Sequence, residues 1–280
     1  MKNQLKKIAL VLITLAFASC SNDDNQTNTN ELDGLTKFKE VVEGNQTIEF
    51  YSPKGALSQG YNDIKFRIKN NETNQYITDA QVEWMPKMHM TMMTHSCPKS
   101  EVVKAATGNL YEGYIVFQMA QNETEYWDLT LDYSIDGEEH SLIIPIDVPA
   151  TAKRVVSSFM GSDNVRYVIA YIDPTSPKVG MNDLKVGIWK MQDMMTFPMI
   201  NDYTVKIDPR MPSMGNHSSP NNVNAQQTTV DNFYIGKLSL TMTGYWKINL
   251  QLQNDLGTIV KGEEITDSVT ESSLFFEIEF

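Results

Sequence analysis

The sequence contains one internal duplication, and this repeat constrains the fold more than any other feature. A Gly-x-Asn-Asp segment, a His-Ser-x-Pro segment and a Tyr-Trp pair each occur twice, in the same order. The matching positions lie 120, 122 and 119 residues apart, for the pairs Gly60 and Gly180, His95 and His217, Trp127 and Trp246. Anchors in a constant order at a nearly constant offset indicate two tandem homologous domains.

Each half alternates apolar and polar residues with the period of a β-strand. Residues 63–68 and 127–136 show this pattern in the first half, and residues 166–172 and 246–252 show it in the second. Short strands separated by turn residues predict an all-β fold, with two tandem immunoglobulin-like β-sandwiches of about a hundred residues each. Trp127 and Trp246 are expected to anchor the two cores.

The predicted domains follow from these patterns. We expect a signal peptide at residues 1–19, a flexible tether at 20–40, a first sandwich at 41–149, a linker at 150–162 and a second sandwich at 163–280.

The N-terminus carries the features of a bacterial lipoprotein signal. A basic start precedes a short apolar run, residues 8–17, which ends at Ala18-Ser19-Cys20. Such a run is too short for a membrane-spanning helix, and the small residues before Cys20 resemble a lipobox. We expect Cys20 to be lipidated and the protein to be anchored in the cell envelope, in the outer membrane, facing either the periplasm or the outside. An ordinary signal peptide with an incidental cysteine is the alternative.

The charge excludes some partners. Removing residues 1–19 takes away three lysines and no acid, so the net charge changes from −12 to −15. A chain this acidic is not expected to bind nucleic acid or anionic lipid through its overall field. Membrane contact is therefore expected through the lipid anchor alone.

Methionine and histidine crowd around a motif found in both halves, Met-Pro-x-Met followed by His-Ser-x-Pro. Thioether sulfur and imidazole nitrogen form the soft ligand set that Cu(I) favours. The candidate ligands of the first half are Met85, Met88, His89, Met90, Met92, Met93, His95 and Cys97. Those of the second half are Met194, Met195, Met199, Met211, Met214 and His217.

Strand geometry suggests how these ligands could meet. In an extended segment Met88, Met90 and Met92 point to one side, and His89, Met93 and His95 point to the other. In the second half, residues 190–199 would add sulfurs to the Met211 loop if the two segments paired.

Two other roles for the methionines stay open. They could pack between the domains as an adaptable apolar interface, or they could form a promiscuous peptide-binding surface. Cys97 could be a further soft ligand or a buried, inert side chain.

The repeated motif resembles the YtkA-like and FixH-like periplasmic domains, which are associated with copper handling and cytochrome oxidase assembly. The resemblance covers residues 45–149 and 160–280 and rests on the motif. It implies copper ligation by Met85, Met88 and His95 in the first half, and by Met211, Met214 and His217 in the second. Lys87 departs from the family pattern, as does the missing glycine after Met88. FixH proteins carry a spanning helix that this sequence lacks, so only metal handling is carried over.

No catalytic motif is present, and we predict that the protein is not an enzyme. The sequence has no nucleophile elbow, P-loop, dinucleotide fingerprint or metalloprotease helix. The preferred hypothesis is a lipid-anchored Cu(I) chaperone, buffer or resistance factor that exchanges copper with a donor or acceptor protein. The alternative is a non-enzymatic surface lipoprotein whose sandwiches bind a protein or glycan partner.

Overall fold

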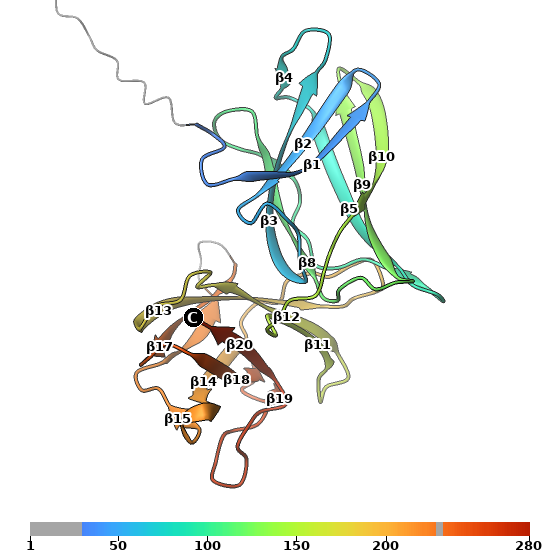
Figure 1. Ribbon diagram of the computed structural model, residues 1–280. Coiled ribbons are helices and arrows are strands. Elements are labelled where there is room, and N and C mark those ends of the chain that lie inside the picture. Colours follow the sequence, from blue (N-terminus) through green and yellow to red (C-terminus); the bar gives the residue numbers. More distant parts are fainter. Residues whose placement is uncertain (1–29, 228–231) are drawn as a thin grey trace, which may run out of the picture. The chain divides into compact units, whose positions relative to one another are not determined.

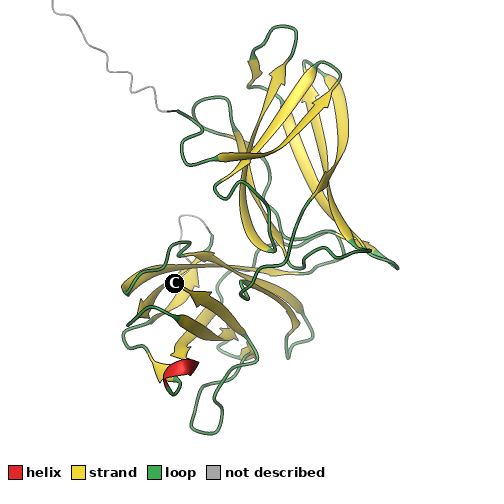
Figure 2. Ribbon diagram, in the orientation of Figure 1, coloured by secondary structure: helices red, strands yellow, loops and turns green. Residues whose placement is uncertain are grey.

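The computed structural model describes residues 30–227 and 232–280, and these residues form β-strands joined by loops (Figures 1 and 2). Their helical content is one 3-10 turn, Pro212–Met214. None of their helices is long and apolar enough to cross a membrane. The expected signal peptide, the lipidated Cys20 and residues 20–29 of the tether lie outside the described residues.

The first sandwich pairs a six-stranded sheet with a four-stranded sheet. The first sheet has the order β1-β2-β3-β8-β7, with β4 paired to β3. Its strands are β1 (Thr36–Glu43), β2 (Gln46–Ser52), β3 (Gly60–Asn70), β4 (Tyr76–Ile77), β7 (Val103–Lys104) and β8 (Tyr111–Phe117). The second sheet has the order β10-β9-β5-β6. Its strands are β5 (Gln81–His89), β6 (Thr94–His95), β9 (Tyr126–Ile135) and β10 (Glu138–Ile146).

The second sandwich repeats this topology in one continuous ten-stranded sheet. Its order is β11-β12-β13-β17-β16-β14-β18-β19, with β15 paired to β14 and β20 paired to β18. Strand β16 pairs with both β17 and β14 and so joins the two layers. The strands are β11 (Val156–Met160), β12 (Arg166–Asp173), β13 (Gly180–Lys190), β14 (Thr204–Met211), β15 (His217–Ser218), β16 (Val223–Gln227), β17 (Tyr234–Leu240), β18 (Tyr245–Gln253), β19 (Ile259–Lys261) and β20 (Phe275–Glu279).

This strand order confirms the predicted immunoglobulin-like fold. In such domains the first, second, fifth and fourth strands make one sheet, and the third, sixth and seventh make the other. The orders β2-β3-β8-β7 and β10-β9-β5 satisfy that rule, as do β12-β13-β17-β16 and β14-β18-β20. The two halves of the chain therefore have the same topology.

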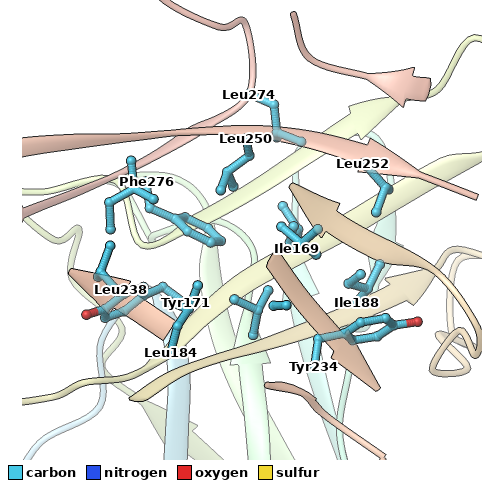
Figure 3. Packing of buried hydrophobic residues seen from close by; sticks show 14 of the residues in the cluster. Ile169, Tyr171, Leu184, Ile188, Tyr234, Leu238, Leu250, Leu252, Leu274 and Phe276 are labelled. Atoms are coloured by element: carbon cyan, nitrogen blue, oxygen red, sulfur yellow. The ribbon is translucent and has the colours of Figure 1, made fainter. Parts of the chain in front are cut away.

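Alternation along the strands builds the two cores. In β3 every second residue from Gly60 to Ile68 is buried, because successive side chains point to opposite faces of a sheet. Trp127 and Trp246 are fully buried, as predicted. Figure 3 shows part of the second core, where Leu250 and Phe276 lie among residues from the other layer.

Two segments expected to lie outside the sandwiches form strands instead. Strand β1 begins at Thr36, inside the predicted tether, and pairs with β2. Strand β11 lies inside the predicted linker and pairs with β12, with Val156 opposite Ala170. Both segments carry β-branched or aromatic residues that can pack against a neighbouring strand, and this packing outweighs the polar residues around them.

A third apolar cluster contains residues of both sandwiches. Val116 and Tyr114 of the first contribute to it, together with Trp189, Phe197 and Phe233 of the second. The Tyr114 ring centroid lies 5.5 Å from that of Phe233 and 6.0 Å from that of Trp189. The two sandwiches therefore share a packed interface.

Candidate soft-metal sites

Met88 and His95 are direct neighbours across two strands of the first sandwich. Met88 of β5 pairs with His95 of β6 on one side and with Trp127 of β9 on the other. The Cβ atoms of such opposed residues lie about 4.5–5.5 Å apart, and their side chains share a face. Met88 is 0% exposed and His95 is 8% exposed. A thioether and an imidazole therefore meet at the buried end of β5.

Hydrogen bonds determine which nitrogen of His95 is available. Its Nδ1 lies 2.7 Å from the backbone oxygen of Ser96, and a carbonyl can only accept, so Nδ1 carries the proton. The Gln118 amide donates to the same oxygen at 3.1 Å. Nε2 is the ring nitrogen left for a metal, as in metal-binding histidines, whose second ring nitrogen donates to a carbonyl or carboxylate. The ring meets Trp127 edge-on, with the centroids 5.7 Å apart.

Two buried oxygen atoms beside His95 lack a hydrogen-bond partner among the described residues. They are Ser96 Oγ and Gln118 Oε1. An unsatisfied buried polar atom costs about 1–3 kcal/mol, so each one calls for an explanation such as a functional role or a bound water. The surroundings of His95 are thus polar on one side and aromatic on the other.

The second sandwich contains the same pair. Met211 of β14 pairs with His217 of β15, and the adjoining pair Arg210–Lys247 places Met211 opposite Trp246. Met211 is 2% exposed, whereas the side chain of His217 is exposed. The chemistry matches the first site, but its histidine faces solvent.

One further methionine accompanies each pair and was not predicted from the sequence. The indole N–H of Trp127 donates to the Met119 carbonyl at 3.1 Å, and that of Trp246 donates to the Met242 carbonyl at 3.0 Å. Both methionines pack, partly buried, against the core of their own sandwich. Their common offset of 123 residues is a signal in the sequence that the Met-Pro-x-Met pattern does not include.

The strand register corrects the alignment of the two motifs. Pro86 lies opposite Leu129 in β9, and Pro209 lies opposite Ile248 in β18. The equivalent segments are therefore Pro86-x-Met88 and Pro209-x-Met211, at the offset of 123 that Met119 and Met242 also show. The alignment of Met85 with Met211 needs an offset of 126, which no other anchor shares.

Two motif methionines consequently lie apart from the sites. Met85 is three residues from Met88 on a strand, so it points to the opposite face of the sheet. Met214 is 56% exposed in the 3-10 turn after β14. The structure does not bring Met85 to Met88, nor Met214 to the face of Met211.

His89 lies on the outer face of β5 with a different partner. Its Nε2 donates to Asp128 Oδ2 at 2.6 Å, and its ring stacks on Tyr126 with centroids 4.8 Å apart. Asp128 is buried, and its Oδ1 has no partner among the described residues. His89 is thus separated from Met88 by the thickness of the sheet.

The expected alternation of residues 88–95 holds only as far as Met90. Met90 packs against the core on the side of Met88. The chain then turns, with Met90 N–H donating to the Met93 carbonyl at 2.9 Å. Met92 at this turn is 88% exposed, and Met93 is exposed as well. The turn returns His95 to the side of Met88, contrary to the extended arrangement.

Cys97 is buried in the first core, where burial raises the pKa of its thiol well above the usual value. A raised pKa favours the neutral thiol over the metal-binding thiolate. Ser219 occupies the equivalent place in the second sandwich, one residue before the repeated proline, and its buried hydroxyl has no partner among the described residues. This position fits the inert alternative for Cys97.

Residues 190–199 lie against the first sandwich rather than the Met211 loop. The N–H of Ser96 donates to the carbonyl of Met194 at 2.8 Å. Met199 forms a bridge with Trp189, and it packs with Met191 against the cluster shared by the two sandwiches. The segment therefore does not pair with the Met211 loop, and Met194 lies beside Ser96, the neighbour of His95.

Histidine, cysteine, aspartate and glutamate alone do not make a metal site in the described part of the chain, where no three of them gather.

Comparisons with known proteins add little to this description. The sequence matches no protein-family model and no curated protein. Among solved structures, it is similar to a chimeric titin Z1Z2-Z1Z2 tandem functionalized with a GRGDS exogenous peptide from fibronectin. That match has 10% identity and a TM-score of 0.17, and it covers 73% of this chain and 90% of the other. Because the TM-score is so low, the fold assignment rests on the strand order.

Proposed function

We propose that this protein is a lipid-anchored, extracytoplasmic Cu(I)-binding protein that stores or transfers copper without catalysing a reaction. The observation that carries the proposal is the buried methionine with a histidine as its direct cross-strand partner, beside a core tryptophan. It occurs in the same register in both sandwiches, as Met88–His95 and Met211–His217. The resemblance to YtkA-like and FixH-like domains points to the same function.

The ligand chemistry favours Cu(I) over harder ions. Thioether sulfur and neutral imidazole are soft donors, whereas Mg²⁺ and Ca²⁺ need oxygen. Neither ligand carries a charge, so a bound Cu⁺ keeps its single positive charge, and the acidic chain attracts it at long range. These properties suit reversible binding and transfer of an ion to a partner protein.

The direct test is an anaerobic Cu(I) titration of the protein from Ser21 onward, in competition with a chromophoric Cu(I) chelator. We expect two equivalents to bind. Met88→Leu should remove one and Met211→Leu the other, since leucine preserves the volume but not the sulfur. Met85→Leu and Met214→Leu are matched controls from the same motif and should keep both equivalents. Binding that persists in the Met88→Leu, Met211→Leu double variant would overturn the proposal.

The envelope location is proposed from the sequence around Cys20 and needs its own test. Cells expressing the full chain should yield a membrane-associated protein that incorporates labelled palmitate. Cys20→Ser should abolish the label and release the protein from the membrane. A Cys20→Ser variant that is still labelled and anchored would contradict lipidation at this residue.

Exposed methionines favour the alternative function, a contact surface for a partner protein. Met92 and Met93 stand at the tip of the turn between β5 and β6. Flexible thioether side chains on a surface adapt to many partners. If the protein takes up no Cu(I) and a pull-down with Met92→Ser, Met93→Ser loses a partner that the unsubstituted protein retains, contact is the function of the methionines.

A further inference from the structure

We propose that the Cu(I) site of the first sandwich is shared between the two sandwiches. The loop of residues 190–199 supplies a thioether from Met194 or Met195 to the metal held by Met88 and His95. The second site, at Met211 and His217, is completed within its own sandwich. This inference rests on the proposed Cu(I) function and specifies the composition of one of its sites.

The backbone contact between the sandwiches lies beside the proposed ligand. Ser96 directly follows His95, and its N–H donates to the Met194 carbonyl at 2.8 Å. Standard bond lengths then place the Met194 Cα within about 5.5 Å of Ser96 N. Met194 remains 43% exposed and Met195 is half-buried, so neither sulfur is needed to fill a core. The side chain of Met194 can therefore approach His95, and Met195 follows it directly in the chain.

Local hydrogen bonds hold this loop in a tight turn. Asp193 Oδ1 accepts the Met195 N–H at 2.7 Å. The N–H of Gln192 donates to the Thr196 carbonyl at 2.9 Å. The turn presents Met194 and Met195 together and keeps a carboxylate charge near them, which favours a cation.

The shared apolar cluster secures the two ends of the loop. Met191 and Met199 pack against this cluster, next to Trp189 and Phe197. Val116 of the first sandwich is buried in the same cluster. Its N–H donates to the carbonyl of Pro98, two residues beyond Ser96. Packing on both sides thus fixes the loop relative to the strand that carries His95.

The histidine of the second sandwich is exposed, and the loop contact beside it, Asn216 to the Thr270 carbonyl, comes from the same sandwich. We therefore expect the first site to bind Cu(I) more tightly than the second. Metal at the first site would also link the two sandwiches, because its ligands come from both.

The test compares the two sites one at a time in the otherwise complete protein from Ser21 onward. Met211→Leu leaves the first site alone, and Met88→Leu leaves the second. Met194→Leu, Met195→Leu is added to each background. We expect Cu(I) affinity to fall at least tenfold at the first site and to stay unchanged at the second. Met181→Leu is the matched control, because Met181 is 45% exposed in the same sandwich but lies in β13.

X-ray absorption of the Cu(I)-loaded Met211→Leu protein gives a second readout. The number of sulfur ligands should drop when Met194 and Met195 are replaced, which a purely structural effect of the loop would not cause. Two bound equivalents, with affinity and sulfur count unaffected by the loop, would overturn the shared site and leave the proposed function standing. No Cu(I) uptake by the unsubstituted protein would overturn both.

Discussion

The two methionine–histidine pairs have the same strand register but different surroundings. Met88 and His95 are both buried, next to a loop of the other sandwich, whereas Met211 is buried and His217 faces solvent. The strand positions of the two pairs are the same, and only the first pair adjoins a backbone contact to the other sandwich among the described residues. The two pairs thus share their strand positions but differ in the exposure of their histidines.

We expect the largest loss of stability when the core tryptophans are replaced. These substitutions test whether the two cores depend equally on their tryptophans. Trp127→Ala and Trp246→Ala each remove a fully buried indole and its hydrogen bond to a methionine carbonyl. Each should lower the free energy of unfolding by about 3–5 kcal/mol. Urea denaturation followed by circular dichroism measures this. A loss in only one variant would show that the two tryptophans are not equivalent.

A reciprocal exchange at the equivalent positions Cys97 and Ser219 should have the next largest effect. Cys97→Ser places a hydroxyl in an apolar core and should cost about 1–3 kcal/mol. Ser219→Cys removes a buried hydroxyl that has no partner among the described residues, and it should stabilise by roughly 1 kcal/mol. Denaturant titration gives both values. If both substitutions destabilised the protein, or both stabilised it, the two positions would not be equivalent.

The thiol of Cys97 offers an independent check on the same comparison. Burial raises its pKa in the folded state, so the folded protein favours the neutral thiol. Above the unfolded-state pKa of about 8.5, unfolding releases this proton, and stability falls as the pH rises. Cys97→Ala should reduce that fall. An aromatic disulfide reagent at pH 8 should modify the unfolded protein far faster than the folded one, and equal rates would show an exposed thiol.

Replacing the two histidines separates stability from metal binding. His95→Gln loses the hydrogen bond to Ser96 and should cost about 1 kcal/mol. His217→Gln changes an exposed residue and should stay within about 0.5 kcal/mol. Each substitution should lower the affinity for one of the two Cu(I) ions in the chelator competition. If only His95→Gln weakened copper binding, the second pair would not be a site.

The smallest effects are expected at the motif methionines that lie apart from the pairs. Met85→Leu and Met214→Leu should each change stability by less than about 1 kcal/mol, because leucine fills a similar volume. Copper stoichiometry should stay at two in both. A lost equivalent in either variant would favour the alignment based on Met-Pro-x-Met over the one based on strand register.

The sequence alone sufficed to predict the fold and the repeat. Constant offsets between anchors and strict alternation in segments such as residues 63–68 specify two similar all-β domains, because a buried strand face needs an apolar residue at every second position. Strand spacing alone also places Met85 and Met88 on opposite faces of the sheet, because they are an odd number of residues apart. The offset of 126 is a second sign in the sequence that Met85 and Met211 do not correspond.

Only the tertiary structure decided which soft ligands meet. The turn at residues 90–93 returns His95 to the face of Met88, and its conformation depends on packing that no local pattern encodes. The contact between Met194 and Ser96 joins residues almost a hundred positions apart on different sandwiches. Alternation reports which face a side chain takes, since that is a local property of the strand. It cannot report which loop of another domain lies against that face, because this depends on the shape and burial of both partners together.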